Sequence, residues 1–253
     1  MAPGGRAVRR TGRRMTHATL SELADVFGLQ ASQVSALDRY VGRLLDWQGN
    51  VTGLSTREEV VGTLVGDALA LLDVDALTGR SGDPWVDLGA GAGIPGVPLA
   101  IAVSSARVTL LEAASRKCAF LRVAVEAAGL DGRCAVECAR SERFAAAGAA
   151  GREAFAVVLA RAVAPLPVLV ELAAPLLAAG GVLLASKTGR ALREEGPAAE
   201  AAAGLCGMAA RPSQALPRSP LDDAVCAVFE KVAATPARLP RREGQAAKRP
   251  LAR

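Results

Sequence analysis

The sequence is poor in the residues that most catalytic and metal sites use. Its 253 residues include a single histidine, His17, and aromatic residues make up only 3% of the chain. The five cysteines form no C-x-x-C pair, so with one histidine they cannot supply a tetrahedral zinc site. Cys134 and Cys138 would share one face of a strand, which is more typical of packing than of chemistry. We therefore expect no metal and the reducing environment of a cytoplasmic protein.

Long apolar runs are also absent. No stretch reaches the roughly 20 apolar residues that a membrane-spanning helix needs, so we expect no membrane segment. Only four of the 30 basic residues are lysines. We attribute this preference for arginine to genome composition and give it no functional weight.

The net charge of +5 is concentrated at the two ends of the chain. Residues 1–15 hold five arginines and no acid, and residues 238–253 hold six basic residues and one glutamate. We interpret residues 1–15 as a disordered arm, unless Met15 is the true start, and residues 234–253 as a basic tail. Such arms favour a polyanionic partner, because cations bound to phosphates release condensed counterions. Tails that only keep the protein soluble are an equally good explanation.

Residues 16–78 have the apolar spacing of a small helical lobe. Ser32 is the expected N-cap of one helix, and Thr56 with Glu59 has the spacing of a capping box at the start of another. The apolar face of the first helix comprises Val34, Leu37, Val41, Leu44 and Leu45.

Between residues 79 and 233, short apolar runs alternate with helical stretches. This alternation predicts an α/β domain with a doubly wound, mostly parallel sheet and helices on both faces. We expect helices near 95–103, 116–128 and 167–178, with Gly180–Gly181 ending the last one. The final strand is expected to lie antiparallel at the sheet edge. The expected strands are 85–88, 107–111, 134–137, 155–160, 181–185 and 224–229.

The segment DLGAGAGIPG, residues 87–96, is the most informative stretch of the chain. It follows the first expected strand, where ligands bind in such sheets. Gly89, Gly91 and Gly93 would allow positive φ and a close approach of a ligand to the backbone. Pro95 suits the first turn of the next helix. The same letters also satisfy the dinucleotide fingerprint, so the pattern alone does not identify the cofactor.

Two acidic residues favour S-adenosylmethionine over a dinucleotide. Asp87, two residues before Gly89, could accept a hydrogen bond from the amine of an amino acid, whereas it would repel a pyrophosphate. Glu112 ends the second expected strand and could accept from both hydroxyls of a ribose, a feature that suits NAD equally well. An NAD-binding oxidoreductase is therefore the weaker alternative for the protein as a whole. For Glu112 itself, the alternative is an acidic residue on the surface with no ligand.

Several further segments complete a resemblance to a known family. The chain resembles the bacterial ribosomal RNA small-subunit methyltransferase G family, also called glucose-inhibited division protein B, over residues 38–251. The resemblance implies a class I methyltransferase fold and transfer of a methyl group from S-adenosylmethionine to N7 of a guanine in 16S ribosomal RNA. The segments that carry it are VDLGAGAGIPGVPLAIA, LLEAASRKCAFLRVAV, ARSERF, LARAVAPLPVLVELAAPLL, LLASKTG and PRREGQAAKRPL.

The resemblance also implies site residues at the matching positions. Cofactor contacts are expected from Gly89, Gly91, Gly93, Ile94, Ser141, Glu142 and Arg161, in addition to Asp87 and Glu112. Arg161, Lys187 and Arg140 are expected to hold the substrate base or a phosphate. A strand-end salt bridge is the alternative for Arg161, and a solvated position at the rim is the alternative for Lys187.

The expected chemistry needs no general base, because guanine N7 carries a free lone pair in the ring plane. The lack of histidine beside the glycine loop therefore fits methyl transfer. Gly53, Leu64 and Val225 depart from the family pattern and leave the exact RNA target open. We expect a monomer that acts on 16S ribosomal RNA or on the small subunit. The rival interpretations are a methyltransferase for a small molecule or protein, and an RNA-binding protein without turnover.

Overall fold

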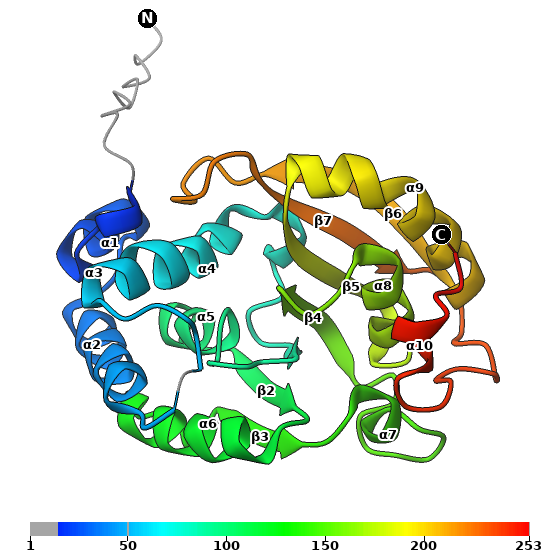
Figure 1. The fold of residues 1–253 in the computed structure, drawn as a ribbon, viewed down its shortest axis with the longest axis horizontal. Helices are drawn as coiled ribbons and strands as arrows, with labels where there is room; N and C mark the ends of the chain where they lie inside the picture. Colours follow the sequence, from blue (N-terminus) through cyan, green and yellow to red (C-terminus); the bar gives the residue numbers. More distant parts are fainter. Residues whose placement is uncertain (1–14, 50, 253) are drawn as a thin grey trace, which may run out of the picture.

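A computed structural model describes residues 15–49 and 51–252. Their core is a seven-stranded sheet of order β3-β2-β1-β4-β5-β7-β6 (Figure 1). Neighbouring strands among β1 to β5 pair in parallel, and β7 pairs antiparallel with β5 and with β6. The predicted doubly wound sheet with an antiparallel final strand is confirmed, but that strand, β7, lies between β5 and β6 and not at the sheet edge. The edge is formed by β6, a strand that the sequence did not predict. The strands are β1 Pro84–Leu88, β2 Arg107–Glu112, β3 Cys134–Cys138, β4 Phe155–Arg161, β5 Leu177–Thr188, β6 Met208–Ala215 and β7 Ala224–Lys231.

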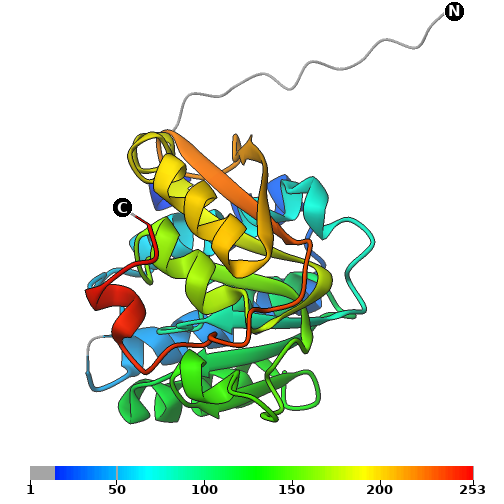
Figure 2. The ribbon, with the colours of Figure 1, turned by 90° about the vertical axis from the view of Figure 1, so that its right-hand side faces the viewer.

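Helices cover both faces of this sheet (Figures 1 and 2). Successive strand residues alternate between the faces and both sets are apolar, as in a sheet buried on two sides. Trp85, for example, belongs to the core cluster that contains residues of α2, α5 and α6, whereas its neighbour Val86 belongs to the cluster that contains residues of α8 and α9. The helices are α1 Leu20–Phe27, α2 Ala31–Asp46, α3 Arg57–Glu59, α4 Gly66–Ala70, α5 Gly96–Ala102, α6 Ser115–Ala128, α7 Ser141–Phe144, α8 Leu166–Ala173, α9 Gly189–Cys206 and α10 Gln245–Lys248.

The N-terminal helices pack into the same core as one face of the sheet. The capping box of Thr56 and Glu59 is confirmed at the start of α3. The predicted N-cap Ser32 is wrong, because α2 begins at Ala31 with Gln30 as N-cap. The Gln30 amide donates to Gln33 Oε1 at 2.8 Å. A π-helical turn, Val60–Val65, joins α3 to α4, and short 3₁₀ turns occupy Met15–His17, Leu71–Asp73 and Asp75–Leu77.

The boundary between α8 and β5 differs from the sequence prediction of a helix over 167–178. The helix ends at Ala173 and the strand already begins at Leu177. Pro175 explains the early end, since proline disfavours helical conformation in the residue before it. Gly180–Gly181 therefore lies inside the strand. A Cβ at Gly181 would come within 2.9 Å of two backbone oxygens, which explains why no side chain stands there.

Two of the five cysteines are paired, although the expected reducing setting disfavours disulfides. A disulfide joins Cys118 of α6 to Cys138 at the end of β3, with their Cα atoms 5.8 Å apart. The first turns of α6 pack beside the end of β3, a tertiary relation that the sequence spacing does not reveal. The remaining three, Cys134, Cys206 and Cys226, are free and buried.

The predicted basic tail is a folded segment, which we call the strap and define as residues 234–252. It includes α10, and its side chains Leu239 and Ala246 are 2% and 3% exposed. Figure 2 shows it running along one side of the molecule, with α10 against α8. Of the predicted basic arm, residues 1–14 lie outside the described part of the chain.

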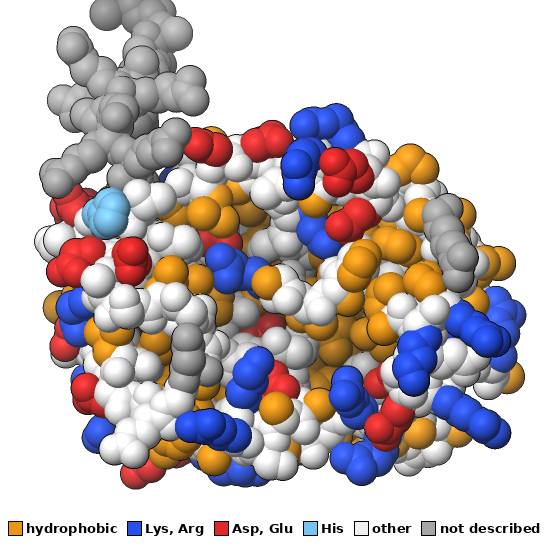
Figure 3. Space-filling view, viewed as in Figure 1, with side chains coloured by type: hydrophobic (Ala, Val, Ile, Leu, Met, Phe, Trp, Pro, Cys, Tyr) orange, Lys and Arg blue, Asp and Glu red, His pale blue; other side chains and the backbone are white. Residues whose placement is uncertain are grey.

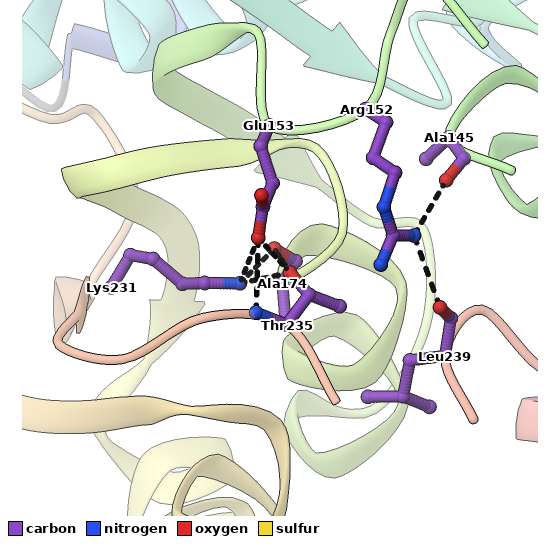
Figure 4. A network of polar contacts seen from close by, with 7 residues as sticks. All are labelled: Ala145, Arg152, Glu153, Ala174, Lys231, Thr235 and Leu239. Carbon is purple, nitrogen blue, oxygen red and sulfur yellow. Dashed lines mark hydrogen bonds and ion pairs between the residues drawn. The ribbon is translucent and has the colours of Figure 1, made fainter. Parts of the chain in front are cut away.

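Buried polar contacts anchor the start of the strap (Figure 4). Thr235 donates from its amide and its hydroxyl to Glu153 Oε1, at 2.9 and 2.6 Å. The Lys231 ammonium lies 3.7 Å from the same carboxylate oxygen, and burial lowers the pKa of Lys231. Arg152 donates to the backbone oxygen of Leu239 at 3.1 Å. These contacts hold the strap to the body of the protein where it leaves β7.

Candidate functional site

A pocket of about 320 Å³ opens at the carboxyl edge of the parallel strands. Its walls come from the ends of β1 and β2, the loops after β3 and β4, helices α6 and α8, and the strap. In the fold this is the switch point, where the chain crosses from one side of β1 to the other and ligands bind in such sheets. Figure 3 shows this face hollowed, with an apolar floor and basic side chains around it.

The glycine loop forms the inner end of the pocket. Gly89, Gly91 and Gly93 have φ of 70°, 56° and 88°, as the sequence predicted. The amides of Gly89 and Ala90 both donate to the backbone oxygen of Leu111, at 2.8 and 3.0 Å, which ties the loop to β2. Gly89 lines the pocket. A Cβ there would lie 2.9 Å from a Val163 methyl group, so only glycine allows the loop after β4 to pack this closely against the glycine loop.

Glu112 lies in the pocket wall and is 8% exposed. Its Oε2 accepts from the Gly91 amide at 3.0 Å, and its Oε1 accepts from the Ala114 amide at 2.8 Å. A carboxylate oxygen can accept more than one hydrogen bond, so each retains capacity for a ligand hydroxyl. The plain surface-acid alternative for Glu112 is therefore wrong.

Asp87 lies beneath the loop and not in the pocket. Its side chain is fully buried, Oδ2 accepts from the Gly96 amide at 2.8 Å, and Oδ1 has no hydrogen-bond partner among the described residues. Burial raises the pKa of Asp87 to about 7, against the lowering effect of the Gly96 amide. Gly91, Gly93 and Ile94 likewise do not line the pocket, and Ile94 is 6% exposed. This geometry supports a role for these residues in holding the loop.

Arg161 ends β4 and forms the strand-end salt bridge that we considered as its alternative. Its Nε donates to Asp67 Oδ2 at 2.7 Å, and the Ser219 hydroxyl donates to Asp67 Oδ1 at 2.7 Å. Asp67 is buried at the start of α4, whereas the Arg161 side chain is 19% exposed. The two Nη groups of Arg161 make no hydrogen bond to the described residues. The salt bridge therefore orients the guanidinium and leaves both Nη groups available as donors.

Lys187 is neither solvated nor free. Its ammonium donates to the backbone oxygen of Ala164 at 3.1 Å and to Glu195 Oε2 at 2.8 Å. The same Glu195 oxygen accepts from the Leu166 amide at 2.6 Å. Lys187 thus fixes the loop after β4, of which Ala162, Val163 and Ala164 line the pocket. Val225, one of the departures from the family pattern, pairs with Lys187 in the β5–β7 ladder.

The loop after β3 supplies a third wall. Arg140, Ser141 and Glu142 all line the pocket, with Ser141 buried and Arg140 exposed. Glu142 Oε1 accepts from the Gly244 amide of the strap at 2.8 Å. Among the predicted residues, the structure therefore brings Gly89, Glu112, Arg140, Ser141 and Glu142 together around one pocket.

The sequence analysis missed the residues that close this pocket. Gly244, Ala246 and Ala247 of the strap line it. Arg241 pins the strap to α8 by donating to both carboxylate oxygens of Glu171, at 2.5 and 2.6 Å. One signal was available, since Glu171 is the single charged residue within the apolar run LPVLVELA of α8. A lone buried acid of this kind requires a partner.

The described residues contain neither a candidate metal-binding cluster nor a candidate membrane-spanning helix. No group of three His, Cys, Asp or Glu side chains there could hold a metal ion. Among the helices at residues 15–49 and 51–252, none is both long enough and apolar enough to cross a bilayer.

Comparisons with known proteins identify the family to which the chain is similar. The sequence model of the GidB family, described as rRNA small subunit methyltransferase G, matches residues 33–213. A protein of that name from Rubrobacter xylanophilus is 39% identical, over 98% of this chain and 95% of its own. Another from Chloroflexus aggregans is 36% identical, over 93% and 98%.

Solved structures support the fold alone. A predicted O-methyltransferase from Agrobacterium tumefaciens, Atu636, superposes with a TM-score of 0.51 at 22% identity, covering 68% of this chain and 82% of its own. Cofactor-bound Rv0187 from MTB superposes with a TM-score of 0.51 at 18% identity, covering 84% and 94%.

Proposed function

The chain belongs to the GidB family of rRNA small subunit methyltransferases, and from this premise we propose that its pocket binds S-adenosylmethionine and serves methylation of guanine N7 in 16S ribosomal RNA. The observation that carries the proposal is the pocket itself. A bare glycine backbone at Gly89, the Glu112 carboxylate and the Ser141–Glu142 turn surround it at the switch point of the sheet. The family's sequence model matches residues 33–213, a range that includes all of these positions.

The residues in the walls fit this cofactor. Glu112 would accept from the ribose hydroxyls with the lone pairs that the Gly91 and Ala114 amides leave available. Gly89 and Val163 both line the pocket, and a side chain at Gly89 would collide with Val163 and disturb this wall. Ser141 and Glu142 would lie beside the adenine. S-adenosylmethionine supplies an electrophilic methyl group on a sulfonium sulfur.

The chain's own residues then have only to position the base. The guanine N7 lone pair needs no proton removed, which agrees with the absence of histidine from the pocket walls. Arg161 would hold guanine O6 or a neighbouring phosphate with its two Nη groups, because arginine offers paired donors in a fixed plane. Asp67 fixes the direction in which that guanidinium points. Lys187 acts indirectly by fixing the loop between β4 and α8.

The substrate follows from family membership and the chemistry of the target. N7 is a major-groove atom, and the deep, narrow major groove of an RNA helix hides it from side chains. The target guanine would therefore lie in a loop or be exposed during assembly of the subunit. The competing substrate classes are a small molecule and a protein.

Labelled S-adenosylmethionine separates these substrate classes. The enzyme would be incubated with unmodified small subunits, with free 16S ribosomal RNA and with a protein and metabolite extract. We expect label in the RNA alone and a loss of at least tenfold in Arg161→Ala. Label in protein or metabolites, with none in RNA, would refute the proposed substrate. Tight NAD binding with no S-adenosylmethionine binding would refute the cofactor.

A further inference from the structure

Five basic side chains around the mouth of the pocket have no partner within the part of the chain that the structure describes. None of them forms a hydrogen bond or ion pair with a side chain or backbone group at residues 15–49 or 51–252. By contrast, Arg161, Lys187 and Arg241 each form an ion pair with a carboxylate. The unpaired five, which we call the rim cations, are Lys117, Arg140, Arg143, Arg242 and Lys248.

The rim cations come from three segments that the fold brings together. Lys117 of α6 and Arg140 before α7 line the pocket themselves. Arg143 follows in α7 and is exposed. Figure 3 shows basic side chains gathered on this face over the region of α7 and α10.

The strap contributes Arg242 and Lys248. Both are exposed, and they flank Gly244 and Ala246, which line the pocket. The strap between them is held firmly, because Arg241 binds Glu171 and also donates to the backbone oxygen of Arg249 at 2.7 Å. The two cations are thus presented from a fixed wall of the pocket.

The acidic residues nearby leave most of this charge uncompensated. Glu142 is engaged by the Gly244 amide, and Glu171 is engaged by Arg241. Glu243 is exposed beside Arg242 and offsets one charge. Five cations against one exposed acid give a strongly positive rim, which suits a partner with regularly spaced negative charges.

We propose that the rim cations form a docking face for the phosphate backbone of the RNA around the target base, with the strap carrying two of the contacts. This inference rests on the proposed function and adds to it the surface that grips the substrate. Unpaired lysine and arginine side chains bind phosphates without reading sequence, so the rim would orient the RNA while the pocket selects the base. The strap then has two roles, as a wall of the cofactor pocket and as a support for RNA.

Salt dependence of RNA binding tests this directly. Binding of fluorescently labelled 16S ribosomal RNA and of small subunits is measured from low to high salt for wild type, Arg143→Ala, Arg242→Ala and Lys248→Ala. Each lost phosphate contact should reduce the slope of log affinity against log salt by about 0.7 to 0.9. Arg107→Ala is the matched control, because Arg107 is exposed at the start of β2, the opposite edge of the sheet. It should keep the wild-type slope.

Two further readouts separate a docking role from a structural one. Arg242→Lys should restore most of the slope, and S-adenosylhomocysteine affinity without RNA should stay within twofold of wild type in all three alanine variants. Slopes equal to that of Arg107→Ala would overturn the docking face. The proposed function fails separately, if wild type binds RNA with the expected slopes but transfers no methyl group. Wild type that does not bind RNA at all would contradict both.

Discussion

The ion pair between Arg241 and Glu171 gives the sharpest prediction about the pocket. The change is Arg241→Ala, which removes both contacts to Glu171 and the bond to the Arg249 backbone. The Glu171 side chain is 3% exposed and the Arg241 side chain 16%. Breaking a buried pair by removing one partner costs roughly 3–5 kcal/mol, because the remaining charge is left uncompensated. Since Arg241 is partly exposed, we take the lower end, about 3 kcal/mol.

If the strap dissociates from the body of the protein, Glu171 becomes solvated and the unpaired buried charge is relieved. This dissociation would expose Leu239 and Ala246. About 3 kcal/mol corresponds to a shift of roughly a hundredfold between docked and undocked states. Apparent affinity falls in proportion to the docked fraction. We therefore expect the Kd for S-adenosylhomocysteine, measured by calorimetry, to rise, with about a hundredfold as the upper limit.

Hydrogen exchange supplies the structural readout for the same variant. The amides of Gly244 and Arg249 are protected by bonds to Glu142 and to the backbone oxygen of Gln245, so both should exchange faster. The control is Arg211→Ala, whose exposed pair with Glu230 lies away from the pocket and contributes at most about 1 kcal/mol. The double change Arg241→Met with Glu171→Met should recover much of the affinity. Unchanged cofactor affinity despite faster exchange would refute the strap as a pocket wall.

Three further predictions concern the loop and the substrate side. Asp67→Asn removes the ion pair that orients Arg161, so kcat/KM for small subunits should fall about tenfold or more while S-adenosylhomocysteine Kd changes little; equal losses in both would argue against an orienting role. Asp87 has a pKa raised to about 7 in the folded state, so its contribution to the free energy of unfolding is lost as pH rises from about 4 to 7. Asp87→Asn should flatten that slope, at most about 1.4 kcal/mol per pH unit in urea titrations, and an unchanged slope would contradict the assignment. Lys187→Met should accelerate exchange at the Leu166 amide and raise cofactor Kd severalfold, whereas loss of RNA binding alone would indicate a direct phosphate contact.

The fold class was predictable because alternation of apolar runs and helical stretches is a local signal. The boundary at α8 was not, since Pro175 outweighed the apolar continuity of 167–178. Within the site, the glycine loop and Glu112 follow from local sequence, because a strand-to-helix turn and a strand end place them. The partners of Arg161 and Arg241 are Asp67 and Glu171, 94 and 70 residues away in the chain, and pairings at that distance leave no local pattern.

The interior position of Asp87 illustrates the same limit. Its spacing from Gly89 suggested a contact with the cofactor. In the structure, the first amide of the helix that follows the loop, that of Gly96, donates a hydrogen bond to the Asp87 carboxylate instead. A Cβ at Gly96 would lie 2.7 Å from that carboxylate, so glycine at this position and the buried acid require each other. Such a relation depends on how the turn closes in three dimensions.

The most direct test of the central claim is identification of the methylated nucleoside. Unmodified small subunits are incubated with enzyme and labelled S-adenosylmethionine, and the 16S ribosomal RNA is then digested to nucleosides and separated. We predict label in 7-methylguanosine, at one site per RNA, and loss of that label in Arg161→Ala. Label in any other nucleoside, or no label from enzyme that binds the cofactor, would contradict it.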